Sequence, residues 1–342
     1  MSLEPFFHEV IAPGRPFYLQ PVYGLLRLVS AGYAAAQSVR SRLYRKKLLS
    51  TRRLECRVIS IGNLTLGGTG KSPMVILVAD ALRRAGFKPA VLSRGYGGNS
   101  ARAVNVVCDG QQVLLSPEIA GDEPVMIARR LKDVPVLTGK DRYATGQYAI
   151  EQWGVDTLIL DDGFQHLALH RDLNILLCDQ RRPFGNGVVF PAGELREPLS
   201  ALKRADLICL TRCGDTGDSE PVAALNSRGV PVIQSGMSVV SLVDLKSGQE
   251  ADIEVIRNQP VAAFSGIAHP DDFFDTLERI PVRLVSRNAY PDHHDYSSSE
   301  LQTLASRARQ SEAGALVTTE KDAVKLAGHA FDLPVYAVRI AP

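Results

Sequence analysis

Short apolar runs and segments with apolar residues at helical spacing alternate along most of this chain. Apolar runs of this length predict buried strands, and the helical spacing predicts amphipathic helices between them. This alternation is typical of an α/β protein with a mainly parallel sheet flanked by helices. The predicted strands cover residues 58–61, 90–93, 157–162, 174–178, 206–211, 261–264, 282–285, 315–318 and 335–338.

Residues 181–204 are dense in glycine and proline, which favours a linker or hinge between two α/β domains. With 342 residues, the chain is long enough for two domains. We therefore expect an N-terminal amphipathic segment with a basic cluster (1–52), a first α/β domain (53–180), a hinge (181–204) and a second, smaller α/β domain (205–342) that closes over the active site.

The N-terminal segment predicts one long amphipathic helix over residues 18–39. Its apolar positions are Val22, Leu25, Leu26, Val29, Tyr33 and Ala36. Arg27 interrupts the apolar run, which stays well short of the ~20 residues that a bilayer crossing needs. We expect the helix to lie on an anionic membrane surface. Two alternatives stay open: a helix docked on the protein itself, and a short or tilted single span.

Charge and cysteine content narrow the class of protein. The net charge of +2 does not indicate a nucleic-acid partner, and nothing in the composition indicates an oligomer. Basic residues nevertheless gather after the N-terminal helix: Arg40, Arg42, Arg45, Lys46, Lys47, Arg52 and Arg53. The five cysteines lack zinc-site spacing, so we interpret them as small buried apolar residues in a reducing compartment.

A glycine-rich loop between the strand at 58–61 and a helix at 71–85 predicts a phosphate-binding site. Glycines allow backbone N–H groups to surround phosphate oxygens, Lys71 supplies a positive charge, and the Ser72 hydroxyl suits Mg²⁺. Thr65 and Leu66 depart from the general forms of this motif. The predicted nucleotide-binding residues are Thr65, Leu66, Gly67, Gly68, Thr69, Gly70, Lys71 and Ser72.

Two groups of acids and one pair of histidines could carry further chemistry. Asp161 and Asp162 end an apolar strand, where a nucleotide-binding sheet places its Mg²⁺-binding acid, although such a pair is also found in purely structural roles. Asp122 could orient and deprotonate an acceptor hydroxyl, or could simply cap the helix after it. His293 and His294 could tune a base or bind metal, or be structural.

Taken together, these residues resemble the tetraacyldisaccharide 4′-kinase family of lipid A biosynthesis. The resemblance extends from the N-terminal helix to about Lys325 and includes the departures at Thr65 and Leu66. It rests on an ordered set of motifs: GNLTLGGTGKSP, LSRGYGG, AGDEP, DRY, LDDGFQH, HRDLNILL, PAGELREPL, FSGIAHP, PDHHDY and TTEKDAVK.

The resemblance implies a P-loop kinase that transfers the γ-phosphoryl group of ATP, with Mg²⁺, to the 4′-hydroxyl of a tetraacyldisaccharide 1-phosphate. The acylated substrate implies work at the cytoplasmic face of a bacterial inner membrane, with the enzyme peripheral or anchored by one helix. Residues 53–180 would then form the kinase domain.

The resemblance also implies roles for individual residues. Asp122 matches the proposed base and His293 matches the histidine paired with it. Because His294 directly follows His293, either histidine could be that partner. Asp161 and Asp162 match metal-binding acids, Gln165 belongs to the same centre, and Tyr96 matches a position near the nucleotide. The positions that support the metal, the transferring phosphate or the site geometry are Glu123, Arg142 and Arg196.

Two other classes compete with this interpretation. A membrane-associated ATPase switch of the deviant P-loop class shares GGxGKS, but that class carries a lysine where this chain has Leu66. An ATP-dependent ligase of related fold would leave the N-terminal helix unexplained.

Overall fold

The computed structural model describes residues 3–213 and 229–342, so residues 1–2 and 214–228 of the predicted first and last domains lie outside it. The chain forms two compact units, each built from two separate segments. The first unit comprises Met1–Lys71 and Val155–Gly236, and the second comprises Ser72–Gly154 and Met237–Pro342. The domain boundaries expected at residues 52, 180 and 204, and the hinge between them, stay predictions.

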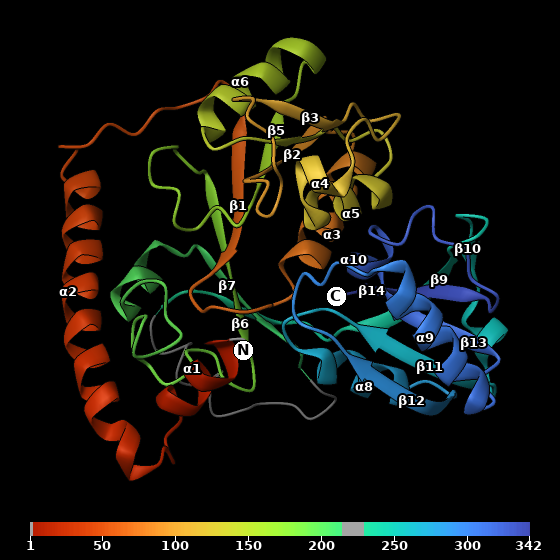
Figure 1. Ribbon diagram of the computed structural model, residues 1–342. Coiled ribbons are helices and arrows are strands. Elements are labelled where there is room, and N and C mark those ends of the chain that lie inside the picture. The colour runs from red at the N-terminus through yellow and green to blue at the C-terminus, as the bar shows by residue number, and fades with distance from the viewer. Residues whose placement is uncertain (1–2, 214–228) are drawn as a thin grey trace. The chain divides into compact units, whose positions relative to one another are not determined.

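Parallel strands form the sheet of the first unit (Figure 1). Their order is β5-β1-β6-β7-β8. Strand β1 therefore lies between two strands that come later in the chain, β5 and β6. Strands β1, β5, β6 and β7 are mainly apolar and mostly buried, as expected for parallel strands covered on both faces, whereas β8, at the end of the sheet, is largely exposed. Their bounds are β1 (Arg57–Asn63), β5 (Thr157–Asp161), β6 (Leu173–Asp179), β7 (Leu207–Thr211) and β8 (Val232–Gln234).

One apolar cluster of the first unit joins β6 and β7 to the stretch predicted as a hinge. Val189, Leu195 and Leu202 from that stretch pack with Phe164 and with strand residues, and all four side chains are buried. Gly62 of β1 lies so close to Phe164 that a Cβ at this position would come within 2.7 Å of the phenylalanine Cβ. The glycine therefore allows the segment after β5 to pack directly on β1.

The helices of the first unit include a long N-terminal one, α2, as the sequence predicted (Figure 1). It is attached to its unit by the Ser30 hydroxyl, which accepts the Ala192 N–H at 2.8 Å, and by Arg40, which donates to the Gln165 carbonyl oxygen at 3.2 Å. Its apolar residues Leu25 and Leu28 are 63% and 73% exposed. The helices are α1 (Leu3–Ile11), η1 (Phe17–Leu19), α2 (Gln20–Arg45) and η2 (Leu199–Arg204), and α3 (Lys71–Arg84) begins at the unit's last residue.

None of the helices in residues 3–213 and 229–342 combines the length and the apolar character that crossing a membrane requires.

The second unit contains two groups of strands. In the first group β4 lies between β2, with which it is parallel, and β3, with which it is antiparallel. The second group has the order β10-β9-β14-β13-β11-β12, in which β9 runs antiparallel to its neighbours and the other pairs are parallel. The bounds are β2 (Pro89–Ser93), β3 (Asn105–Cys108), β4 (Val136–Thr138), β9 (Ser238–Asp244), β10 (Glu250–Ala251), β11 (Pro260–Ser265), β12 (Arg283–Ala289), β13 (Ala315–Thr319) and β14 (Val335–Ala341).

Helices of the second unit cover the six-stranded sheet from both faces. Apolar residues of α9 pack with Phe264 and Leu316 in one cluster, and Phe273 and Phe274 of α8 pack with Val261 in another. The helices are α4 (Pro117–Ala120), α5 (Asp122–Arg130), α6 (Arg142–Trp153), η3 (Ile253–Ile256), α8 (Pro270–Glu278), α9 (Ser298–Gln310) and α10 (Glu320–Ala323).

The α/β class with mainly parallel sheets is confirmed, and so are all nine predicted strands, each within a few residues. The sequence did not predict the short or polar elements, namely α1, α4, α8, α9, α10, β3, β4, β8, β9 and β10.

Candidate active site

The predicted phosphate-binding loop follows β1 and leads into α3. Gly67 and Gly70 have φ angles of +92° and +79°, a region that glycine enters without strain. Two backbone hydrogen bonds join the start of the loop to residues 194–196. The Leu66 N–H donates to the Glu194 carbonyl oxygen at 2.7 Å, and the Arg196 N–H donates to the Leu64 carbonyl oxygen at 2.7 Å. This pairing brings the Arg196 segment alongside the loop.

Lys71 directs its ammonium group back toward the end of β1. Its Nζ lies 3.2 Å from Asn63 Oδ1 and 3.8 Å from Asp162 Oδ1, and its side chain is 12% exposed. The Asn63 amide also donates to the carbonyl oxygens of Thr65 at 2.9 Å and Gly67 at 3.4 Å. Asn63 therefore connects the loop backbone to the lysine that the sequence predicts to bind phosphate.

Asp161 and Asp162 stand at the end of β5, where Asp161 is in register with Ile61 of β1. Asp161 is buried, whereas Asp162 turns outward with a left-handed backbone, φ +56°. Asp162 accepts hydrogen bonds from Arg196 Nη1 at 3.0 Å and 2.7 Å. The first unit thus brings together predicted residues from three separate motifs: Lys71, Asp162 and Arg196.

Gln165 also lies next to this group. Its side-chain Nε2 donates to the Asn63 backbone carbonyl oxygen at 2.9 Å. Thr69 is held from another side, because the buried Thr211 hydroxyl donates to its carbonyl oxygen at 3.0 Å. Gly68 has open space around its Cα, and Ser72 is the buried second residue of α3.

The donor set at the end of β5 fits magnesium. Within the described ranges no group of three or more His, Cys, Asp or Glu side chains is arranged to hold a metal ion. Magnesium commonly takes one or two carboxylates and completes its shell with substrate phosphates and water. Asp161 and Asp162 are adjacent oxygen donors beside a phosphate-type loop, so they match that manner of binding.

The second unit organises its predicted residues around the start of α5. Gly121 precedes the helix with φ +92°, and a Cβ there would clash with the Tyr96 carbonyl oxygen, so the loop after β2 packs closely on this turn. Asp122 is the first helical residue, and Gly121 occupies the N-cap position. Tyr96 is 75% exposed, with its ring centroid 6.0 Å from that of His293.

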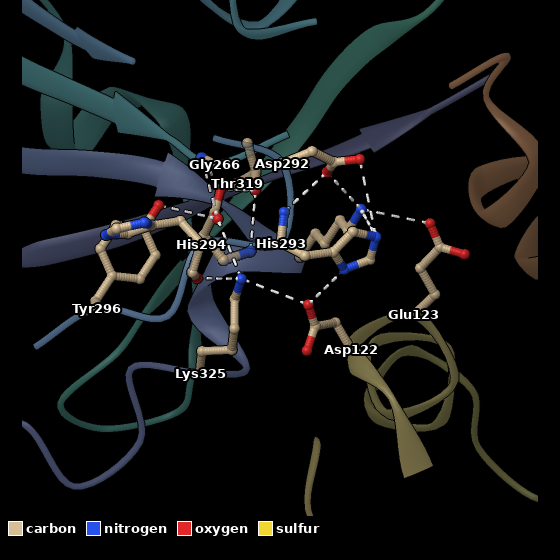
Figure 2. Close-up of polar contacts among 11 residues, drawn as sticks. Asp122, Glu123, Gly266, Asp292, His293, His294, Tyr296, Thr319 and Lys325 are labelled. Carbon is tan, nitrogen blue, oxygen red and sulfur yellow. Dashed lines mark hydrogen bonds and ion pairs between the residues drawn. The ribbon is translucent and has the colours of Figure 1, made fainter. Parts of the chain in front are cut away.

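Asp122 and His293 are in direct contact (Figure 2). His293 Nδ1 lies 3.0 Å from Asp122 Oδ2, and the left-handed backbone of His293, φ +59°, orients the ring. Lys321 Nζ lies 3.2 Å from Nε2 of the same ring. Because an ammonium group only donates, Nε2 accepts and Nδ1 carries the proton that it donates to Asp122.

His294 faces a different set of residues. Its ring stacks on Tyr290, and its Nε2 lies 3.2 Å from Glu300 Oε1. Of the two adjacent histidines, His293 is therefore the one in contact with Asp122.

Lysines and acids alternate around the Asp122–His293 pair. Lys321 Nζ lies 3.1 Å from Asp292 Oδ1 and 3.6 Å from Glu123 Oε1. Burial alone would lower the pKa of Lys321, but Glu123 and Asp292 raise it above the usual value. Burial alone would raise the pKa of Asp122, but the His293 hydrogen bond and nearby positive charges lower it, so this carboxyl is ionised at neutral pH.

Arg142 begins α6 and is buried. Asp141 caps the helix by accepting the N–H groups of Tyr143 and Ala144, and Arg142 Nη1 donates to the Gly139 carbonyl oxygen at 2.8 Å. This contact fixes the loop between β4 and α6.

Fold and loop geometry together define an α/β protein of the phosphate-binding-loop class. The family model for tetraacyldisaccharide-1-P 4′-kinase matches residues 22–341, so the chain belongs to the tetraacyldisaccharide 4′-kinase family.

Individual relatives agree with the family match. The chain is 45% identical over 329 residues to a tetraacyldisaccharide 4′-kinase from Syntrophus aciditrophicus, a match that covers 92% of this chain and 87% of that protein. A kinase of the same name from Geobacter metallireducens is 45% identical over 305 residues, and the match covers 89% of this chain and 89% of that protein. A crystal structure of LpxK from Aquifex aeolicus in complex with ATP matches with a TM-score of 0.76 and 32% identity, covering 93% of this chain and 94% of that one.

Sequence reasoning missed several residues of these clusters. Asn63, Lys321, Asp322 and Lys325 received no role, although Asn63 lies in GNLTLGGTGKSP and the other three lie in TTEKDAVK. These motifs were the signal that the sequence offered. The contacts of Lys321 with His293 and of Lys325 with Asp122 join segments that are distant in the chain.

Proposed function

We propose that this chain transfers the γ-phosphoryl group of ATP to the 4′-hydroxyl of a tetraacyldisaccharide 1-phosphate, which forms lipid IVA in lipid A biosynthesis. The single observation that carries the mechanism is the contact between Asp122 and His293, residues 171 positions apart in the sequence. A carboxylate that is ionised and oriented by a histidine suits the deprotonation of an alcohol. Family membership supplies the substrate class.

The glycine loop and its neighbours would bind the phosphates of ATP. Backbone N–H groups of the loop and the Lys71 ammonium neutralise the β- and γ-phosphates, and Arg196 stabilises the charge that spreads over the transferring group. Asn63 keeps the loop and Lys71 in register. Gln165, which is hydrogen-bonded to Asn63, supports the same end of β1.

Asp122 would act as the base on the acceptor. It accepts the proton of the 4′-hydroxyl as that oxygen forms a bond to the γ-phosphorus, while the bond between the γ-phosphorus and the β–γ bridging oxygen breaks and ADP leaves. His293 donates Nδ1–H to Asp122 and holds its orientation. Tyr96 and Arg142 support the site from the loops at the ends of β2 and β4.

Asp161, Asp162 and Ser72 would hold Mg²⁺, with Glu123 in a supporting position. When bound, the ion neutralises charge on the β- and γ-phosphates.

An acylated disaccharide remains in the bilayer, so the enzyme has to work at the membrane surface. The exposed apolar residues of α2 and the cationic residues at its C-terminal end suit an anionic cytoplasmic leaflet. We therefore place the chain at the cytoplasmic face of the inner membrane as a peripheral protein.

The test is transfer of labelled γ-phosphate from ATP to purified tetraacyldisaccharide 1-phosphate in mixed micelles. The wild-type chain should label the lipid and the Lys71→Ala variant should not. A folded, ATP-binding wild-type protein that labels no lipid would refute the proposal. Nucleotide-dependent dimerisation would then favour the ATPase switch, and labelling or ligation of a small soluble acid would favour the ligase.

A further inference from the structure

Lys325 is a largely buried lysine whose ammonium group lies among oxygen acceptors (Figure 2). Its Nζ lies 3.4 Å from Asp122 Oδ2 and donates to the His294 carbonyl oxygen at 2.6 Å. Only 9% of the side chain is exposed. A buried ammonium is unfavourable unless acceptors and negative charge surround it, so these contacts fix the position of Nζ.

Asp322 is a second carboxylate near Lys325. This carboxylate is fully buried, and its Oδ1 lies 3.9 Å from Lys325 Nζ. It accepts hydrogen bonds from the Gly266 N–H at 3.1 Å, the Tyr296 hydroxyl at 3.0 Å and the Thr319 hydroxyl at 2.6 Å. Because its donors come from three different segments, Asp322 cannot move independently of the surrounding fold.

The same lysine reaches both partners of the Asp122–His293 pair. It contacts Asp122 directly, and through the His294 carbonyl it holds the loop that carries His293. His293 and Lys325 meet the same carboxylate oxygen, Oδ2, at 3.0 Å and 3.4 Å. Neither of these two contacts involves Oδ1, the other oxygen of Asp122.

We propose that Lys325 is a positioning residue for the phosphoryl transfer: its ammonium group holds Oδ2 of Asp122 against His293 and leaves Oδ1 to receive the acceptor proton. This inference rests on the proposed function. It also gives the TTEKDAVK motif a role. Asp322 fixes Lys325 next to the six-stranded sheet, and Lys325 in turn fixes the side chain of Asp122 at the start of α5.

The first experiment measures kcat and KM for lipid phosphorylation in mixed micelles. Lys325→Met removes the charge at similar length and should lower kcat about tenfold, because small displacements of a reacting group cost one to two orders of magnitude. The KM for ATP should stay unchanged. Lys325→Arg keeps a cation and should recover part of kcat, and Lys246→Met, which removes an exposed lysine of the same unit, should match the wild type.

The second experiment separates positioning from a merely structural role. If Lys325 acts through Asp122, then adding Lys325→Met to Asp122→Asn should cause no further loss of kcat beyond that of Asp122→Asn alone. If Lys325 only stabilises the fold, the two losses should multiply. Lys325→Gln, which keeps a hydrogen-bond donor without the charge, repeats the cycle if Lys325→Met does not fold.

Multiplying losses, an unchanged kcat in Lys325→Met, or failure of both neutral variants to fold would each overturn the inference. Lack of lipid labelling by the wild-type chain would instead refute the proposed function. The wild-type control in every assay keeps these two failures distinct.

Discussion

Arg196 Nη1 lies 2.7 Å from Oδ2 and 3.0 Å from Oδ1 of Asp162, and Lys71 Nζ lies 3.8 Å from the same carboxylate. Two cations of the predicted phosphate site thus share one acid. A nucleotide phosphate would offer both cations a more strongly charged partner, so we predict that Arg196 exchanges its contact with Asp162 for one with phosphate.

Arg196→Met should lower kcat about a hundredfold, because loss of one group that stabilises transition-state charge costs about two to three orders of magnitude. ATP affinity should change less, since the loop backbone and Lys71 remain. Lipid phosphorylation and equilibrium ATP binding measure the two effects. Arg181→Met, which removes an arginine that is 53% exposed, is the matched control. Equal losses in both measurements would contradict a role in the transition state.

Asn63→Asp should weaken ATP binding about tenfold. The substitution replaces the amide donor with an oxygen that faces the Thr65 and Gly67 carbonyl oxygens, so the loop loses two hydrogen bonds and gains repulsion. Asn288→Asp removes a comparable bond to the Ala263 carbonyl oxygen in the other unit and should leave ATP binding unchanged. Isothermal titration measures the affinity of both variants for ATP. Equal ATP affinities of the two variants would refute the role of Asn63 in holding the loop.

Fold prediction succeeded where one physical signal dominated. Strands such as β1 and β5 are short apolar runs that are buried on both faces, and α2 has a regular apolar stripe. By contrast, β12 is half-exposed and carries the polar residues Arg283, Arg287 and Asn288. The apolar pattern therefore predicts only the first part of this strand. The compact units are also built from interleaved segments, which no local pattern reveals.

Sequence motifs alone identify some of the candidate site residues, whereas they do not identify those that only folding brings together. Lys71 and Asp162 follow from loop and strand chemistry, and family resemblance paired Asp122 with His293. Lys325 lies about two hundred positions from Asp122, and a lysine in a polar segment is usually a solvated surface residue. Its burial could be learned only from the structure.

His293→Gln should lower kcat by about tenfold or more, because it removes the ring that orients the base. His294→Gln removes a ring that contacts Tyr290 and Glu300, so its loss of kcat should be much smaller. Lipid phosphorylation at saturating ATP compares these adjacent variants, and thermal melting checks that both fold. A larger loss in His294→Gln would reverse the assignment of the two histidines.

Replacing Leu25 and Leu28 together with glutamine should weaken binding to vesicles that contain phosphatidylglycerol by about tenfold or more, since each leucine contributes about 2 kcal/mol when buried in a membrane. Both side chains are exposed, so stability should not fall. Vesicle sedimentation measures the binding. Leu77 and Leu114, also exposed, provide the matched double substitution. Unchanged sedimentation of the Leu25 and Leu28 variant would remove α2 from the membrane contact.

Arg130 and Glu320 form a nearly buried ion pair in the second unit, with Arg130 Nη1 2.5 Å from Glu320 Oε2 and Arg339 Nε 3.1 Å from Oε1. Burial raises the pKa of Glu320 despite these two arginines. A raised pKa means that the folded state holds this proton more tightly than the unfolded state. The contribution of Glu320 to stability is therefore greatest at low pH and declines as the pH rises through its folded pKa.

Arg130→Met leaves this carboxylate with less positive charge beside it. The variant should lose about 3 kcal/mol of unfolding free energy near neutral pH, as expected when one partner of a buried pair is removed. The loss should be smaller at about pH 5 than at about pH 8, because protonation of Glu320 relieves it. Denaturant unfolding at both pH values measures this difference. Arg257→Met breaks an exposed pair with Glu254 and should leave stability nearly unchanged at either pH. An equal loss at both pH values would show that Glu320 is not the group that responds to Arg130.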